Sequence, residues 1–346
     1  ILILTLKFLK MKKLFSYFLV VMLIPAFVLT GCKDDKDEDP IVTGNFTTLS
    51  TYMTNQNLDL PTLLDGWVID PEPIADGGIV DVDNDFTIPD WTVFDIRSAD
   101  DFALGHVKGS VNVSLANIVT EAQAINDNTA KILVVCYSGQ TAGRAVMALR
   151  LSGFPNAKVS KFGFSAWSDN ATFDKWSSKV SDQADGDANW VTTAAPTMPV
   201  NGYPTWTTTS TDGAEILAEK VTEMLANSSW IVGGTDVLAT PANYSIYNYW
   251  VEADYTNFGH FSGAFRVEPM SLNLETASSL NPENDNLIYC YTGQTSSIIT
   301  AWLQVIGYNV KSIGNGVNGL RYTTLSDAGK PHWHFPYHSY GYEVSK

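Results

Sequence analysis

Basic residues are scarce in this sequence, and cysteine is scarcer still. The 346 residues include 21 lysines and arginines against 37 aspartates and glutamates, so the formal net charge is -16 at pH 7. An acidic surface repels phosphate backbones, and we therefore expect no nucleic-acid partner. The three cysteines, Cys32, Cys136 and Cys290, are too few for a fold held by several disulfides. The length favours about two domains.

The N-terminal segment, residues 1–31, is typical of an export leader. Met11-Lys12-Lys13 is a positive start, residues 14–29 are mostly apolar, and the segment leads into Leu29-Thr30-Gly31-Cys32. These last four residues resemble the lipobox of bacterial lipoproteins, which implies cleavage before Cys32 and attachment of lipid to its thiol. An ordinary signal peptide or a membrane anchor with a chance cysteine is the alternative, although the apolar run is only marginally long enough to span a bilayer.

An acidic tract follows the leader, within residues 32–44. Residues 33–40 read Lys-Asp-Asp-Lys-Asp-Glu-Asp-Pro, which cannot bury apolar surface and predicts a disordered tether. The tract also resembles the acidic export tag of Bacteroidetes surface lipoproteins, with a plain solvated linker as the alternative. Together these features predict a lipid-anchored protein of the bacterial cell envelope. They place it at the outer membrane, on the periplasmic face or the cell surface.

Two short stretches end in cysteine at what the pattern predicts to be the end of a strand. The apolar run 132–135 leads into Cys136 and a polar, glycine-containing loop, and a helical pattern follows. Residues 287–289 lead into Cys290 in the same way. Backbone N–H groups and the helix dipole converge on a cysteine in such a loop. We therefore expect the loop to favour the nucleophilic thiolate over the thiol.

The second half of the chain repeats the first at an offset of 154 residues. His106 and Cys136 are 30 residues apart, and so are His260 and Cys290. A repeat of this length indicates a duplicated domain. Within each copy, strand-like runs alternate with helical patterns, which predicts a parallel α/β sheet. We expect one domain over 45–185, a linker over 186–211 and a more diverged domain over 212–346.

The order of motifs in the first copy is similar to that of the rhodanese (sulfurtransferase) family. The motifs are Asp95-Ile96-Arg97, the turn 105–110, the loop Cys136-Tyr137-Ser138-Gly139-Gln140-Thr141 and the segment 163–167. The resemblance is strong over about residues 45–185 and weaker over 205–330. It implies two α/β domains, each a parallel five-stranded sheet flanked by helices. The cysteine loop would lie at the carboxyl end of a central strand, where open α/β sheets bind ligands.

The same resemblance implies a reaction. In rhodaneses the loop cysteine takes a sulfane sulfur from a donor such as thiosulfate or mercaptopyruvate and becomes a persulfide, which then passes the sulfur to a thiophilic acceptor. It implies catalysis by Cys136 and Cys290 without a metal or organic cofactor. The small-molecule donor would bind the loops that follow these two cysteines: Tyr137, Ser138, Gly139, Gln140, Thr141, Tyr291, Thr292, Gly293, Gln294 and Thr295. Ser138 and Thr141 can add hydroxyl donors, and Gly139 permits the tight backbone. A catalytically silent tandem rhodanese that serves as a scaffold is the alternative.

Two rival chemistries for the loops are weaker. Phosphatases of the same fold need an arginine six positions after cysteine to clamp phosphate. That position holds Ala142 in the first loop and Ser296 in the second, and Arg144 lies on the following helix. A disulfide between the two loop cysteines would indicate a redox device, but both stand in the same kind of nucleophile loop, which favours chemistry.

The remaining candidates have structural explanations. Asp95 and Arg97 fit an ion pair near the sheet end, and His106 and His260 fit turn hydrogen bonds. The tail contains His332, His334 and His338, which raises the possibility of a metal site. Aromatic residues and prolines surround these histidines, so we expect no metal and a closing segment packed on the second domain.

Overall fold

The computed structural model describes residues 42–44, 46–208 and 210–346. The leader, the predicted lipidation site at Cys32 and nearly all of the acidic tether lie outside the described residues. Within the described part of the chain, no helix combines the length and the apolar character needed to cross a membrane.

The first half of the chain forms a sheet of five parallel strands. Its order is β2 (Val68–Ile69), β6 (Lys158–Ser160), β5 (Lys131–Val135), β3 (Trp91–Asp95) and β4 (Val111–Asn112). Strand β5 is the central one, and its residues 132–135 are all buried. A run that is apolar on both sides of the strand is expected where helices cover both faces of a parallel sheet.

Short helices and turns precede, connect and follow these strands. They are α3 (Leu60–Leu63), η1 (Ile74–Asp76), α4 (Ala99–Leu104), η2 (Leu115–Asn117), α5 (Ile118–Ala124), α6 (Gln140–Leu151) and η3 (Gly163–Ala166). Helix α6 follows the central strand and is buried along its whole length except at Thr141. A helix that is buried all round must have partners on opposite sides. Here they are the first sheet and the second half of the chain.

The second half forms another sheet of five parallel strands in the same order. The strands are β9 (Ile231–Val232), β14 (Val310–Ile313), β13 (Asn286–Tyr289), β10 (Ser245–Asn248) and β12 (Phe265–Arg266). The helices and turns that precede, connect and follow these strands are α7 (Gly213–Ala226), α8 (Gly234–Ala239), η4 (Pro241–Asn243), α9 (Glu252–Phe258), η5 (Thr276–Ser279), α10 (Gln294–Val305), η6 (Gly316–Gly319) and α11 (Tyr322–Asp327). The predicted fold class, parallel five-stranded sheets flanked by helices, is confirmed.

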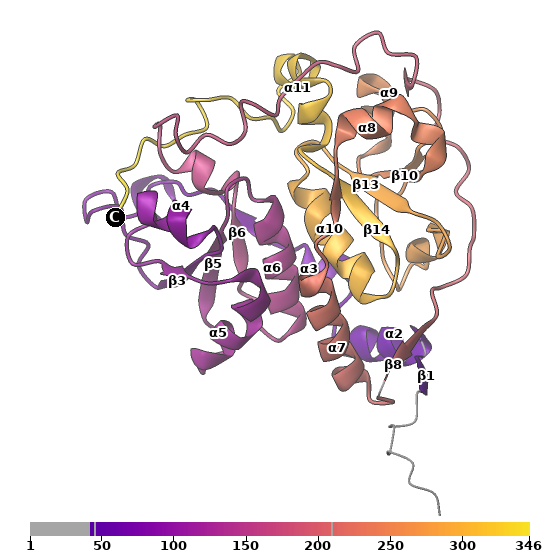
Figure 1. Cartoon of the computed structure of the whole chain (residues 1–346), viewed down its shortest axis with the longest axis horizontal. Coiled ribbons are helices and arrows are strands. Elements are labelled where there is room, and N and C mark those ends of the chain that lie inside the picture. Colours follow the sequence, from indigo (N-terminus) through magenta and orange to yellow (C-terminus); the bar gives the residue numbers. More distant parts are fainter. Residues whose placement is uncertain (1–41, 45, 209) are drawn as a thin grey trace, which may run out of the picture. The chain divides into compact units, whose positions relative to one another are not determined.

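Helices α6 and α10 lie side by side between the two sheets (Figure 1). A Cβ at Gly143 would lie 3.2 Å from the Ser297 hydroxyl and 3.3 Å from the Ile298 amide, so the two helices approach closely there. One apolar cluster draws on both halves, including Val146 from α6 and Ile299 from α10. The helices that follow the two cysteines therefore share a single core.

Residues 42–44 and 46–59 contact the second half of the chain. Strand β1 (Val42–Gly44) pairs antiparallel with β8 (Trp206–Thr208), and α2 (Phe46–Asn55) packs on α7. The Asp59 carboxylate accepts hydrogen bonds from the Ser271 hydroxyl at 2.5 Å and the Leu272 amide at 2.9 Å. Another short pair, β7 (Trp190–Val191) with β11 (His260–Phe261), links the predicted linker to the second half.

The C-terminal tail runs from the second half of the chain to the first half. It starts on the second half, where the Trp333 amide donates to the Asn318 side-chain oxygen at 2.8 Å. It then reaches the first half, where the Tyr340 amide donates to the Ala166 carbonyl at 2.9 Å. Ser345 and His106 exchange two backbone hydrogen bonds of 3.0 Å (Figure 1). The closing segment expected on the second domain, residues 331–338, does contact it through Trp333, and the residues that follow pack on the first half.

Candidate active site

Cys136 lies between the end of β5 and the start of α6. Its Sγ accepts hydrogen bonds from the Gly139 amide at 3.1 Å and the Ala142 amide at 3.3 Å. Gly139 has a φ of +80°, a conformation that glycine adopts readily and that turns the loop amides inward. The predicted cradle of N–H groups around the sulfur is therefore present.

Burial of the Cys136 thiol and the N–H groups around it have opposite effects on the pKa of the thiol. Cys136 is 4% exposed, and this burial raises the pKa of its thiol. The amides of Ala142, Ser138, Gly139 and Thr141 act in the opposite direction without overcoming it. The loop amides thus favour the thiolate, as expected, but burial of the sulfur has the larger effect, and the pKa of the thiol is raised overall. The amides do point at the sulfur, where negative charge develops when the proton leaves.

A turn formed by η3 holds the cysteine loop in place. The Phe164 amide donates to the Cys136 carbonyl at 2.7 Å, and the Ser165 amide donates to the Tyr137 carbonyl at 3.2 Å. Gly163 has a φ of +64°, and a Cβ on it would lie 2.4 Å from the Cys136 carbonyl oxygen. The glycine of the motif 163–167 is therefore required by a close backbone contact with the Cys136 loop.

Two cationic side chains lie near the ring of Tyr137, which is half-buried. The Arg97 guanidinium lies 5.7 Å and the Lys175 ammonium 5.9 Å from the centre of its ring. Arg97 also forms the predicted ion pair with Asp95 at 2.6 Å and donates to the Gly105 carbonyl at 2.7 Å. Lys175 was not predicted, because it follows the motif by several residues and reaches the loop only in the folded chain.

Cys290 has a similar loop with different neighbours. It is 2% exposed, and its Sγ accepts a hydrogen bond from the Ser296 amide at 3.3 Å. The Ser296 hydroxyl lies 3.7 Å from the same sulfur. Tyr291 stacks on Trp250 at 4.5 Å and donates its hydroxyl hydrogen to Asp254. The same Asp254 carboxylate forms an ion pair with Lys330 at 2.8 Å, so a charge pair contacts the second loop.

The remaining loop side chains bond to protein groups. The Ser138 hydroxyl accepts from the Gln140 side-chain amide at 3.0 Å, and the Thr292 hydroxyl accepts from Gln294 at 3.2 Å. The side-chain oxygens of both glutamines also accept hydrogen bonds from backbone amides in the opposite half of the chain. Thr141 and Thr295 lie in the first turns of α6 and α10, and Gly293 repeats the left-handed backbone of Gly139 with a φ of +77°.

The structure agrees with the roles expected for the other singled-out residues. The His106 Nδ1 lies 3.0 Å from the Phe102 carbonyl oxygen, and the His260 Nδ1 lies 3.4 Å from that of Tyr255. Arg144 points away from the cysteine and donates to the Gln304 side chain at 2.8 Å. Burial lowers the pKa of Arg144 to about 9. This arginine therefore supports the contact between the halves and does not form a phosphate clamp.

The tail histidines are held by aromatic rings and backbone groups. The His334 amide donates to the His338 Nδ1 at 2.9 Å, and the His332 Nδ1 lies 2.7 Å from the Lys330 carbonyl oxygen. Burial, helped by nearby positive charge, lowers the pKa of His338 to about 4. Across the residues that the structure describes, no group of three or more His, Cys, Asp or Glu side chains is placed to hold a metal ion.

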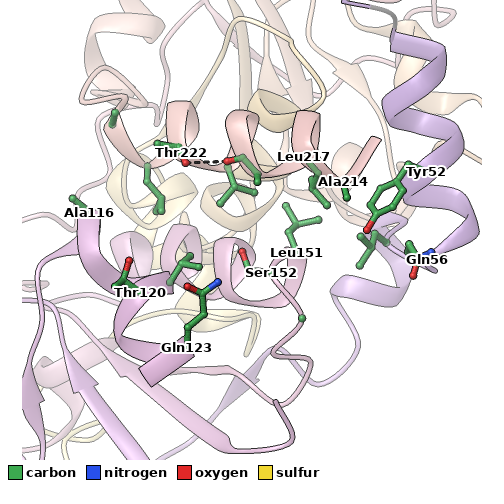
Figure 2. A pocket seen from close by; sticks show the side chains of 17 residues that line it. Tyr52, Gln56, Ala116, Thr120, Gln123, Leu151, Ser152, Ala214, Leu217 and Thr222 are labelled. Atoms are coloured by element: carbon green, nitrogen blue, oxygen red, sulfur yellow. Dashed lines mark hydrogen bonds between the residues drawn. The ribbon is translucent and has the colours of Figure 1, made fainter. Parts of the chain in front are cut away.

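The two cysteines are free thiols. A cleft of about 790 Å³ lies apart from both, between α2, α5, the end of α6 and α7 (Figure 2). The residues lining it are apolar or uncharged, such as Leu217 and Leu151 in its walls and Gln123 at its edge. The lining of this cleft includes neither cysteine and no charged side chain, so the cysteine loops stay the candidate site.

Comparison with known proteins places the first loop in a defined family. A model of the rhodanese-like domain matches residues 80–170, which include Cys136 and end before Cys290. The thiosulfate sulfurtransferase GlpE of Ectopseudomonas mendocina (strain ymp) is 38% identical over 84 residues, which cover 23% of this chain and 72% of GlpE. GlpE of Shewanella oneidensis is 33% identical over 78 residues, which cover 22% of this chain and 73% of that protein.

Two solved structures were also found to be similar over part of the chain. A rhodanese-3-like domain from Anabaena sp. is 26% identical and aligns with a TM-score of 0.22, covering 22% of this chain and 88% of that domain. A thiosulfate sulfurtransferase from Pseudomonas aeruginosa is 18% identical with a TM-score of 0.23, covering 70% of this chain and 40% of that one.

Proposed function

The chain belongs to the rhodanese-like family, and from that premise we propose that it is a sulfurtransferase that carries sulfane sulfur on Cys136. One observation supports this function most directly: the Gly139 and Ala142 amides donate to the Cys136 Sγ at 3.1 and 3.3 Å. Amides fixed in this way stabilise negative charge on sulfur without rearranging during the reaction. The match to the rhodanese-like domain model, over residues 80–170, contains this loop.

The proposed reaction has two transfers through one persulfide. The Cys136 thiolate attacks the outer sulfur of thiosulfate, a new S–S bond forms, and the old S–S bond breaks as sulfite leaves with the bonding electrons. A thiophilic acceptor such as cyanide or a thiolate then attacks the outer sulfur of the persulfide and releases the Cys136 thiolate. The loop amides hold the negative charge in both states, and the Lys175 ammonium near Tyr137 favours an anionic donor.

The absence of a clamping arginine supports sulfur over phosphate. Ala142 occupies the position where a phosphatase loop places its arginine, and Arg144 is turned to Gln304 in the second half. A loop without that side chain has no bidentate donor for a phosphate group.

We extend the proposal to the whole chain on the repeated sheet order. Cys290 would be a second sulfur carrier in a second rhodanese-like domain, and Cys32 would carry the lipid that anchors both domains in the cell envelope. The Asp254 carboxylate beside Tyr291 is paired with Lys330, whereas the Lys175 ammonium lies beside the first loop, so we expect Cys136 to react faster with thiosulfate.

Mass spectrometry tests the proposed function. The full chain is incubated with thiosulfate, and the peptides that contain Cys136 and Cys290 are weighed without reduction. We expect a gain of one sulfur on Cys136, and the variant Cys136→Ser serves as the control. The second candidate function is a catalytically silent tandem rhodanese that serves as a scaffold, which the burial of both thiols favours. This candidate predicts that neither cysteine gains sulfur from thiosulfate or mercaptopyruvate.

A further inference from the structure

Two buried glutamines connect the cysteine loops across the contact between the halves. Gln140 and Gln294 are the first residues of α6 and α10 and are 5% and 4% exposed. Each stands four positions after its cysteine, Cys136 or Cys290. The sulfur-transfer chemistry described above uses neither side chain.

Gln294 links its own loop to the first half of the chain. Its Nε2 donates to the Thr292 hydroxyl at 3.2 Å, inside the second loop. Its Oε1 accepts a hydrogen bond from the Phe162 amide at 2.8 Å, in the first half. One side chain therefore satisfies a buried backbone N–H of the opposite half and is held in place by its own loop.

Gln140 makes the same two bonds in the reverse direction. Its Nε2 donates to the Ser138 hydroxyl at 3.0 Å, and its Oε1 accepts from the Asn315 amide at 2.8 Å. The two glutamines are thus related by the internal repeat, and each reaches the element that supports the other's loop.

The amides that the glutamines bind belong to the turns behind the cysteines. Phe162 and Asn315 have φ values of +58° and +59°, a strained conformation for residues with side chains. The turn after Phe162 carries the Phe164 amide that donates to the Cys136 carbonyl at 2.7 Å. A single turn therefore separates the oxygen of Gln294 from the backbone of the first nucleophile.

The glutamine oxygens also touch the opposite loops directly. A Cβ on Gly139 would lie 2.3 Å from the Gln294 Oε1, and a Cβ on Gly293 would lie 2.5 Å from the Gln140 Oε1. Each loop glycine is therefore packed against the glutamine of the other half, which limits how far the cysteine loop can move.

We propose that Gln294 is a positioning residue for Cys136 and that Gln140 is one for Cys290, so that each half of the chain sets the loop geometry of the other's thiol. The proposal rests on the proposed function in taking these two thiols as the sulfur carriers. Loss of Gln294 leaves the buried Phe162 N–H without its acceptor. The turn then shifts to find another partner, and the cradle around Cys136 loses its alignment.

The test measures thiol reactivity separately from sulfur transfer. The rate at which iodoacetamide alkylates each cysteine is followed by peptide mass over a range of pH, in the full chain and in Gln294→Met. The matched control is Gln304→Met, because Gln304 also lies on α10 and bonds across the halves, to Arg144 at 2.8 Å, without touching a cysteine loop. Gln140→Met, followed at Cys290, is an independent second variant.

We expect Gln294→Met to slow alkylation of Cys136 about tenfold below the midpoint of its pH profile and to raise that midpoint by about one pH unit, the effect of one buried hydrogen bond. Gln304→Met should leave the Cys136 profile unchanged. An unchanged profile in Gln294→Met, or an equal change in both variants, overturns the proposal. Thiosulfate loading of the same samples tests the proposed function separately, because a wild-type protein that takes up no sulfur still reports the positioning effect.

Discussion

Replacement of Gly163 by alanine should disable the first cysteine through a backbone contact. The new Cβ would lie 2.4 Å from the Cys136 carbonyl oxygen and 2.6 Å from the Ser138 amide nitrogen. Ordinary contacts are longer, so the loop must move by roughly 1 Å. A displacement of that size at a reacting group lowers the rate by about 100-fold. We therefore expect loading of Cys136 from thiosulfate to slow by that factor.

Gly153→Ala is the matched control for this variant. Gly153 also has a positive φ, +93°, but a Cβ there would meet no atom within 4 Å. Both variants should lose about 1–2 kcal/mol of unfolding free energy from the left-handed backbone. Only Gly163→Ala should lose sulfur loading as well. Peptide mass spectrometry and denaturant unfolding measure the two effects. A wild-type loading rate in Gly163→Ala would refute the role assigned to the turn.

Two further predictions concern stability. Burial lowers the pKa of His260 to about 4 from its ordinary 6.5, so the unfolded chain binds this proton first, and stability should fall as the pH drops from about 6.5 to 4. Urea unfolding should show a shallower fall in His260→Gln, and an unchanged slope would contradict this cause. The Asp95–Arg97 pair is fully buried, so Asp95→Asn, which leaves the Arg97 charge unpaired, should cost about 3–5 kcal/mol of unfolding free energy. A loss below about 1 kcal/mol in guanidinium unfolding would contradict it.

The sheets and the first cysteine loop could be predicted from the sequence because strong local patterns define them. The apolar run 132–135, the glycine at 139 and the helical pattern after it are all short-range signals, and each has the predicted structure. Helix α2 was missed because its sequence, rich in Thr and Ser, has little helical preference. It buries only Leu49 and Met53, one turn apart, against the second half of the chain.

The contacts between the halves could not be predicted from local patterns. The Asp59 carboxylate meets Ser271, and the tail residue Ser345 meets His106, although more than 200 residues separate each pair. The rise in the thiol pKa of Cys136 has the same origin, because burial depends on what the rest of the chain places over the loop. One signal was available: a glutamine stands at the same position in both loops, and its repetition could have suggested a shared role.

Sulfur transfer by the purified full chain, with and without each loop thiol, tests the proposed function most directly. Thiocyanate formation from thiosulfate and cyanide is measured for the wild type, Cys136→Ser and Cys290→Ser. We predict that Cys136→Ser removes most of the activity and that Cys290→Ser retains most of it. A Cys136→Ser variant that transfers sulfur at the wild-type rate would contradict the assignment of Cys136 as the sulfur carrier.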